Sequence, residues 1–251
     1  MAKQDGIITL RGTIGKITFL KRKGVHLAQT KGGIDKGRIA SDPAFLRTRE
    51  NGAEFGRAAK GGKLLRTCLR ALLVSVKDGT MSNRLGSEFN KVIKADATNP
   101  RGLRNVIDGE AELLEGFDFN VNGKLGTTLY APFTSTIDRV AGTLEIVLDP
   151  FVPINMVNAP QGTTHFKIKS AGASIDFEQE VYTVDVNETA ELPWNNVATA
   201  GITLTNTVEP NSTHPLFLVI GIEFFQIVNG TSYPLKSGTF NPLNLIKVDG
   251  G

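Results

Sequence analysis

A glycine-containing turn near the N-terminus is the first segment whose composition could support chemistry. Residues 12–16, Gly-Thr-Ile-Gly-Lys, superficially match a phosphate-binding loop. That loop needs a glycine five residues before its last glycine, and Ser or Thr after the lysine. Leu10 and Ile17 occupy these two positions. We therefore expect a glycine hairpin here and no nucleotide site.

Nucleophiles and metal ligands do not cluster in the sequence. His26, His165 and His214 are far apart, and none has a second ligand at the spacing of a zinc site. Cys68 is the only cysteine, so no internal disulfide can form, and its apolar neighbours predict a core residue. A Ser-His-Asp site assembled in space stays open, but no nucleophile-elbow pattern supports it. The sequence therefore predicts no enzyme, no metal and no cofactor.

Carboxylates gather at the point where the charge of the chain changes sign. Such a cluster could bind a cation or supply paired carboxylates for acid–base chemistry. A cation site, however, needs ligands that converge from a defined loop, and this cluster lies beside Leu113 and Leu114 at the end of an expected amphipathic helix. A solvated face or an acidic partner face in salt bridges between subunits is favoured. Its members are Asp108, Glu110, Glu112, Glu115 and Asp118.

Lysines and arginines form the most orderly pattern in the chain. Four of them fall on one helical stripe, within roughly 60° of each other at 100° per residue. Phosphate backbones are recognised by basic side chains presented in this way. Aromatic side chains are not interleaved with them, which disfavours recognition by base stacking. The candidate set for binding nucleic acid or an acidic partner is the stripe Lys63, Arg66, Arg70 and Lys77, with Arg47, Arg49, Arg57 and Lys60 on the preceding helix and Lys21, Arg22 and Lys23 on a hairpin tip.

The charges divide sharply along the chain. Residues 1–106 hold 22 Lys and Arg against 8 Asp and Glu, whereas residues 107–251 hold 6 against 17. A division of this kind suggests a polyanionic partner, or the basic half of one copy meeting the acidic half of another. A solvated basic face without a partner is the alternative.

The elements that position these charges begin with short β runs. Residues 6–11, 17–20 and 25–28 predict a small meander or hairpin, and residues 29–40 predict a loop. Helix starts at Asp42-Pro43, because aspartate caps the free amides and proline suits the first helical position. We expect this helix to continue to about Val76, with an interruption at Gly61-Gly62.

Two further helices follow in the basic half. One is expected from Ser82 until Asn99-Pro100 ends it, and a short one from Arg101 through Leu114. Within the first helix, small residues lie at i, i+4 and i+7 and leave a groove into which another helix or chain can pack. Close packing inside the same subunit is the favoured interpretation. These small residues are Gly52, Gly56 and Ala59.

From Gly116 onward the hydrophobic pattern has a period of two. Phe117 and Phe119 alternate with polar residues, and Asn122-Gly123 predicts a tight hairpin turn. The run from Leu216 to Val228 is almost wholly apolar and predicts a central strand covered on both faces. About eight short strands indicate an antiparallel β-sandwich. The predicted fold is α+β, with a basic β-hairpin and helical region over residues 1–107 and an acidic sandwich over residues 108–251.

Targeting and membrane signals are lacking. The N-terminus leads into a short β-like segment instead of a long apolar stretch. No run approaches the roughly 20 apolar residues of a membrane span. The sequence therefore predicts a cytoplasmic protein without a membrane partner.

Several segments carry a resemblance. They are residues 12–19 (GTIGKITF), 41–45 (SDPAF), 47–58 (RTRENGAEFGRA) and 101–106 (RGLRNV). With them, most of the chain resembles an uncharacterised family of similar-length proteins encoded in Bacteroidota genomes. The family carries no assigned activity or functional residues. The resemblance implies a bacterial origin and leaves the argument from charge unchanged.

Two functions are consistent with these patterns. The first is a self-assembling structural protein, a homopolymer such as a filament, tube or shell, in which the basic half of one copy contacts the acidic half of the next. The second is a coat or packaging protein that binds the phosphate backbone of nucleic acid. Self-assembly is favoured because the sequence combines divided charge, no catalytic motif and a small-residue helix face.

Overall fold

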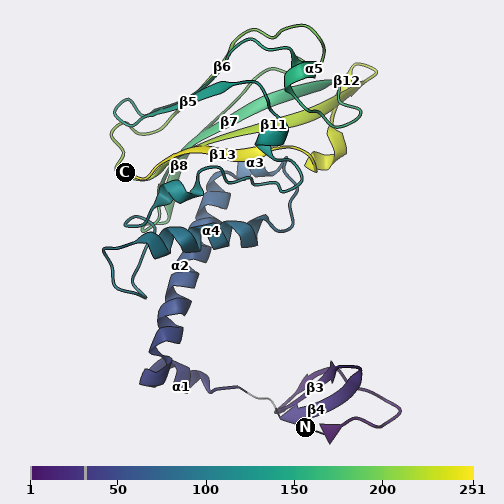
Figure 1. The fold of residues 1–251 in the computed structure, drawn as a ribbon, viewed down its shortest axis with the longest axis vertical. Helices are drawn as coiled ribbons and strands as arrows, with labels where there is room; N and C mark the ends of the chain where they lie inside the picture. Colours follow the sequence, from purple (N-terminus) through teal and green to yellow (C-terminus); the bar gives the residue numbers. More distant parts are fainter. Residues whose placement is uncertain (1, 31–32) are drawn as a thin grey trace. The chain divides into compact units, whose positions relative to one another are not determined.

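The protein divides into two compact units, Met1–Arg49 and Glu50–Gly251 (Figure 1). The computed structural model describes residues 2–30 and 33–251, with the backbone alone at residues 236 and 237. The sequence places its boundary near residue 107, where the charge changes sign. The structure places the division earlier, because helices that follow residue 50 share a hydrophobic core with strands of the C-terminal half.

The first unit holds a four-stranded antiparallel sheet, in agreement with the predicted meander. The strand order is β1-β4-β3-β2. Lys23 and Gly24 have φ angles of 49° and 82° at the turn between β3 and β4, as a two-residue hairpin turn of the primed type requires. The strands are β1 (Ala2–Lys3), β2 (Gly12–Ile14), β3 (Ile17–Arg22) and β4 (Val25–Thr30).

A short helix follows where the sequence predicts only a loop. Helix α1 (Lys36–Ser41) begins after Asp35, whose carboxylate accepts a hydrogen bond from the backbone N–H of Arg38 at 3.2 Å. The Arg38 side chain in turn donates to Asp42 at 3.0 Å. A single helical turn held by capping side chains needs no apolar stripe. For that reason the hydrophobic pattern did not reveal it.

The long helix starts where the Asp-Pro pair predicts. Asp42 accepts a hydrogen bond from the N–H of Ala44, a 3-10 turn η1 (Pro43–Phe45) follows, and α2 (Leu46–Cys68) continues from it. The predicted interruption at Gly61-Gly62 is wrong. A Cβ at position 61 would lie 2.8 Å from Cδ1 of Phe89, so these glycines allow a second helix to pack closely against an unbroken α2.

The remaining helices complete one layer of the second unit. The helix predicted from Ser82 is confirmed as α4 (Met81–Ala95), which buries Leu85, Phe89, Val92 and Ile93. The first helix ends earlier than predicted, because α2 stops at Cys68 and the short α3 (Arg70–Leu73) follows. Between residues 101 and 114 only the 3-10 turn η2 (Ala111–Leu114) is helical, so the predicted helix there is wrong for most of its length.

A large antiparallel sheet forms the middle layer of the second unit. Its longest strand, β11 (Leu216–Val228), pairs with β7 on one side and with β12 and β13 on the other, which confirms the predicted central strand. The other strands are β7 (His165–Asp176), β8 (Val181–Glu188), β9 (Leu192–Pro193), β12 (Thr231–Pro234) and β13 (Leu243–Asp249).

A second, smaller sheet forms the third layer. It consists of β10 (Ile202–Thr207), β6 (Thr143–Leu148) and β5 (Phe133–Asp138), in that order. Alternate residues of β11 reach the two cores: Leu216 and Leu218 contribute to the core shared with the small sheet, and Phe217 and Val219 to the core shared with the helices. The fold is thus α+β, with antiparallel sheets in the C-terminal half, as the sequence predicts (Figure 1).

Side chains bridge the edges of the two sheets. Asn187 donates to the carbonyl of Thr205 at 2.8 Å, and Asn206 donates to the carbonyl of Asp185 at 3.0 Å, so β8 and β10 are joined without a backbone ladder. On the opposite side Lys247 donates to the carbonyl of Ser135 at 3.1 Å. The sheets therefore curl toward a partly closed barrel.

The segment between the helices and the sheets lacks the predicted hairpin at Asn122-Gly123. Phe117 and Phe119 are instead buried with their rings 5.1 Å apart. Their alternation mimics a strand, but only Asp118 forms an isolated bridge to the large sheet. The short remaining elements are η3 (Leu125–Thr127), α5 (Pro153–Met156) and η4 (Leu235–Gly238). None of the helices in the described part of the chain has the length and apolar content to cross a membrane.

Candidate functional site

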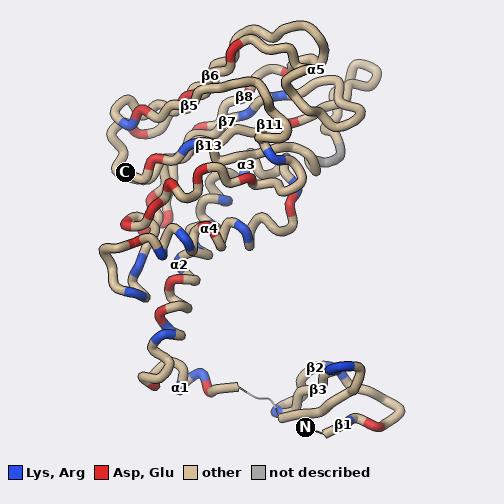
Figure 2. The backbone as a smooth tube through the Cα atoms, in the orientation of Figure 1, with Lys and Arg blue, Asp and Glu red and all other residues tan. Residues whose placement is uncertain are grey.

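The candidate basic residues along α2, blue in Figure 2, have different hydrogen-bond partners. Arg57 lies partly buried and donates to the carbonyls of Gly102 and Arg104 at 2.7 and 3.0 Å. One turn earlier, Glu54 is 3% exposed and accepts the N–H of Gly102 at 2.8 Å. Arg57 therefore serves to hold the segment after α4 against α2, and its charge is directed inward.

A second buried carboxylate holds the other end of this segment. The Asp96 side chain accepts hydrogen bonds from the N–H groups of Thr98, Asn99 and Asn105. Burial by itself would raise the pKa of Asp96, but these hydrogen bonds hold it below the ordinary value. Asp108, predicted to lie on an acidic partner face, accepts from the side chains of Asn99 and Asn105. Hydrogen bonds among polar groups of residues 96–108 therefore hold this segment in its conformation.

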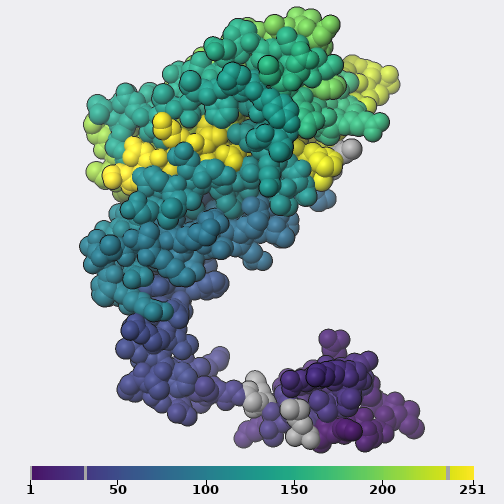
Figure 3. Space-filling model, viewed as in Figure 1, coloured from purple at the N-terminus to yellow at the C-terminus, as the bar shows by residue number. Residues whose placement is uncertain are grey.

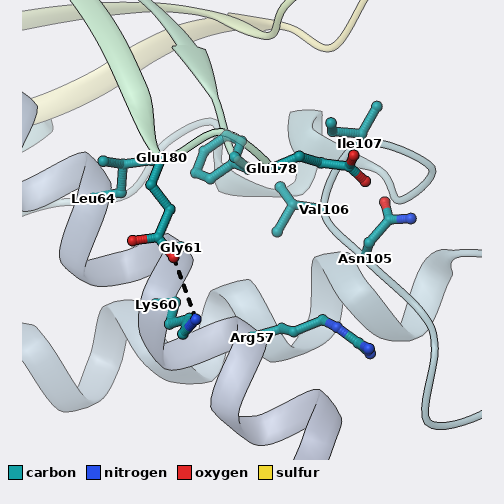
Figure 4. Close-up of a pocket in the computed structure, with 10 residues that line it drawn as sticks. Arg57, Lys60, Gly61, Leu64, Asn105, Val106, Ile107, Glu178 and Glu180 are labelled. Atoms are coloured by element: carbon teal, nitrogen blue, oxygen red, sulfur yellow. Dashed lines mark hydrogen bonds and ion pairs between the residues drawn. The ribbon is translucent and has the colours of Figure 1, made fainter.

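One basic residue of α2 does meet the acidic half within the same chain. Lys60 approaches Glu180 at 3.3 Å, at the rim of a cleft of about 330 Å³ between α2, residues 105–107 and the turn after β7 (Figure 4). The two side chains are 73% and 58% exposed. An ion pair so open to water stabilises a fold by at most about 1 kcal/mol.

The remaining members of the basic set divide between internal and open positions. Arg49 donates to the carbonyls of Ile39 and Asp42, and Arg66 to that of Gly62. The predicted stripe is not carried by a single helix, because Lys77 lies beyond α3. Exposed members are Lys21, Arg22, Lys23, Arg47, Lys63, Arg70 and Lys77.

The acidic cluster is used mainly to fasten the C-terminal strand. Glu112 accepts the N–H of Gly250 at 2.8 Å, and Glu115 accepts the N–H of Val248 at 3.4 Å. Asp118 accepts from the side chain of Asn244 at 2.8 Å. β13 (yellow) reaches the surface between the small sheet and the helical layer in Figure 3. Glu110 is exposed. The cluster is therefore dispersed around β13 and does not converge on one point.

The Cys68 thiol and the candidate metal ligands complete the residues considered for chemistry. Cys68 is buried in the core, as predicted, and burial raises the pKa of its thiol to about 12. A thiol with such a pKa stays protonated and unreactive at neutral pH. Within the described ranges, no group of three or more His, Cys, Asp or Glu lies close enough to hold a metal ion.

The apolar surface of the N-terminal sheet is the feature that sequence reasoning missed. Among the described residues of the first unit, none is buried. Residues 6–11 form a loop instead of the predicted strand, and at its tip Ile7 is fully exposed and Ile8 is 80% exposed. Gln4 closes this loop through hydrogen bonds with Leu10 and with the carbonyl of Leu27. The loop therefore exposes two isoleucines, and the hydrogen bonds of Gln4 hold its ends together.

One face of the same sheet is also apolar. The register pairs Ile14 with Ile17 and Phe19 with Ala28, so these four side chains share a face. Ile14 is 65% and Ile17 45% exposed. A sheet of this size gains independent stability only when an apolar face is covered. We call Ile7, Ile8, Ile14 and Ile17 together the N-terminal apolar surface.

The small residues at Gly52, Gly56 and Ala59 are not packed as expected. A Cβ added at Gly52 or Gly56 would meet no described atom within 4 Å, and Ala59 is exposed. The small residues that do pack inside the chain are Ala58, Gly61 and Gly62. The favoured interpretation, close packing within the subunit, is therefore wrong for this face of α2.

Because Gly56 is open and Gly61 is closely packed, replacing each by alanine should change the free energy of unfolding in opposite directions. Gly56→Ala should raise the free energy of unfolding by about 0.5–1 kcal/mol, because alanine favours helix and nothing obstructs its methyl group. Gly61→Ala should lower it by about 1–3 kcal/mol, because the methyl group would overlap the buried ring of Phe89. Urea unfolding followed by circular dichroism measures both. Equal effects at the two sites would contradict the packing described.

Two features are thus not accounted for by the contacts within the described ranges: the N-terminal apolar surface, and the exposed basic side chains of Lys21, Arg22, Lys23, Lys63, Arg70 and Lys77. Within the N-terminal sheet, exposed basic side chains and exposed isoleucines occur together, and this combination suits a partner that is itself apolar and acidic. The basic side chains also suit a phosphate backbone, but the apolar side chains would not contribute to binding it. Comparison with protein-family models, with curated proteins and with solved structures finds no match to this chain.

Proposed function

We propose that the protein is a self-assembling structural protein, in which the basic N-terminal unit of one copy docks on an acidic surface of the next. The observation that carries the proposal is the N-terminal unit itself, whose described residues include exposed isoleucines and no buried side chain. Residues 1–49 hold 11 Lys and Arg against 3 Asp and Glu. Residues 50–251 hold 17 against 22. The two units are therefore opposite in charge.

Apolar burial and charge would have different effects in such a contact. Covering the N-terminal apolar surface supplies the affinity, at about 25 cal/mol for each Å² removed from water. Opposite charge directs the encounter and disfavours pairing of two basic units. Because the donor and acceptor surfaces differ, the contact is head to tail. Repeated contacts of that type close into a ring or continue as an open filament.

Salt dependence and particle shape together test the proposal. Negative-stain microscopy and light scattering of purified protein at about 0.05 M and 0.5 M NaCl should show polymers or rings that form less readily at high salt, where charge is screened. A monodisperse monomer at both salt concentrations would refute self-assembly. Treatment with nuclease before the measurement removes nucleic acid as a cause of association.

Nucleic-acid binding is the second candidate, and one observation favours it. Lys21, Arg22 and Lys23 project from the hairpin tip, and within the described ranges no carboxylate forms an ion pair with them. Phosphate binding would appear as a high ratio of absorbance at 260 nm to that at 280 nm, lost on washing with salt. Charge reversal at Lys21 and Lys23 would then weaken binding equally for all sequences. Under the assembly proposal, the protein is free of nucleic acid.

A further inference from the structure

An apolar row on strand β8 is left uncovered by the helices. Tyr182, Val184 and Val186 pair in register with residues of β7 that are fully buried beneath the helical layer, so the three lie on the helix-facing side of the sheet. They are nevertheless 39%, 36% and 39% exposed. Val181, on the other face of β8, is 56% exposed. Four exposed large apolar residues within six positions form the densest such group among the described residues of the second unit.

β8 is also an edge strand over part of its length. It pairs with β7 along one side, and on its other side the bridging hydrogen bonds from Asn187 and Asn206 reach only residues 185–187. Residues 181–184 therefore present an apolar edge that natural sheets usually protect by charge, a bulge or a covering element. An edge of this kind is suited to contact with another sheet.

The charge around this row is acidic. Residues 176–188 hold five carboxylates and no Lys or Arg. Lys60 reaches Glu180, Lys167 and Lys169 reach Glu188, and His214 lies 4.0 Å from Asp176. Glu178 is exposed, and among the described residues no cation pairs with it. A negative rim therefore persists beside the apolar row, even after the neighbouring cations are counted.

The N-terminal sheet has the complementary character. Residues 2–30 hold six Lys and Arg and one Asp, together with the four isoleucines of the N-terminal apolar surface. The two largest groups of exposed apolar side chains in the described chain thus carry opposite charge. Two N-terminal sheets would repel one another, and two β8 rows would do the same.

We propose that the acceptor for the N-terminal apolar surface is the β8 row, Tyr182, Val184 and Val186, of a second copy of this chain. The inference rests on the proposed self-assembly and names its acceptor. Apolar side chains of the two sheets meet at the centre, and the lysines of the hairpin tip lie near the carboxylates that flank β8. Each copy then offers one donor and one acceptor, which is the condition for head-to-tail growth.

Disulfide trapping between two variants tests the proposed pair. Ile14→Cys protein is mixed with Val184→Cys protein under mild oxidation, and a two-chain band on a non-reducing gel should form in the mixture. The band should be at least about fivefold weaker with either variant alone, or when Val197→Cys, 65% exposed outside the row, replaces Val184→Cys. Native Cys68 does not compete, because it is buried.

The outcomes of this experiment distinguish the proposed β8 acceptor from self-assembly itself. If light scattering shows assembly and the mixture gives no specific band, the β8 acceptor is wrong while self-assembly stands. If the unmodified protein stays monomeric, self-assembly itself is wrong. A double variant carrying both cysteines in one chain should also link between chains. If it links within single chains at low concentration instead, the row is covered by its own N-terminal sheet and the inference is overturned.

A charge exchange provides a second readout that is independent of cysteine geometry. Lys21→Glu and Glu178→Lys should each raise the concentration needed for assembly by about threefold to tenfold, because each places like charges together. When both substitutions are in the same chain, the concentration needed for assembly should return to within about threefold of that of the unmodified protein. Additive losses without recovery would contradict the proposed contact. Both positions are exposed, so folding should be unaffected, and circular dichroism checks this.

Discussion

Replacing Ile7 and Ile8 together with aspartate is expected to raise the concentration needed for assembly by at least about 100-fold. Each isoleucine, exposed in the isolated chain, contributes about 1.5–3 kcal/mol when fully covered. Loss of both then costs about 3 kcal/mol or more, and each 1.4 kcal/mol corresponds to a factor of ten. Light scattering over a dilution series gives the concentration at which assembly begins.

A matched control separates this surface from general effects of added charge. Val140→Asp with Val197→Asp places the same number of carboxylates at sites that are 72% and 65% exposed in the acidic unit. This double variant should assemble within about threefold of the unmodified protein. If the isoleucine variant assembles as readily as the control, the N-terminal apolar surface is not part of the contact. Urea unfolding should be nearly the same for both, because none of the four side chains is buried.

Arg57→Ala is expected to lower the free energy of unfolding by about 2–4 kcal/mol. The substitution removes two charge-assisted hydrogen bonds and leaves the carbonyls of Gly102 and Arg104 without this donor. Hydrogen bonds to charged groups contribute about 1.5–3 kcal/mol each, and a buried group left unpaired adds a cost. Chemical unfolding in urea measures the change.

Arg70→Ala is the comparison, because Arg70 is exposed and lies in the same basic pattern of the sequence. Its effect on unfolding should stay within about 0.5 kcal/mol. The pair of variants distinguishes an arginine that holds the fold from one that is free to meet a partner. Equal stability of the two variants would contradict the structural assignment of Arg57.

The strands were predictable where their pattern was strong. Most of the 13 residues of β11 are apolar because helices cover one face and the small sheet the other, and the sequence shows this as a run interrupted only by Glu223 and Gln226. β5 was not predicted, since its inward residues Phe133, Ser135 and Ile137 include a serine and are only half buried. A pattern that weak is common in loops, so only the backbone pairing with β6 revealed the strand.

Long-range contacts account for the errors in the helices. The sequence indicates a break at Gly61-Gly62, because glycine weakens an isolated helix by about 1 kcal/mol per residue. Contact with Phe89, 28 positions away, offsets that cost. The partners of Arg57 are backbone carbonyls 45 and 47 residues distant. The sequence therefore shows where the basic residues are, but not which of them form hydrogen bonds within the chain.

The exposed N-terminal surface was hidden for a similar reason. A sequence shows that Ile7, Ile14 and Ile17 are apolar, and the usual expectation is that such residues are inside. Only the observed register and exposure reveal that the sheet has no core of its own. The division of charge between the ends of the chain was visible from the start, and it is the part of the proposal that the sequence supported directly.

In the proposed assembly, the order of a sheet that has no buried residue of its own would depend on docking. If docking orders residues 2–30 further, the first contact between two free chains would have to offset the conformational entropy lost in that step. Polymer growth should then show a lag at low protein concentration. This lag should shorten sharply when preformed polymer fragments are added. Protection of the β3 and β4 amides from hydrogen exchange should rise in step with polymer mass.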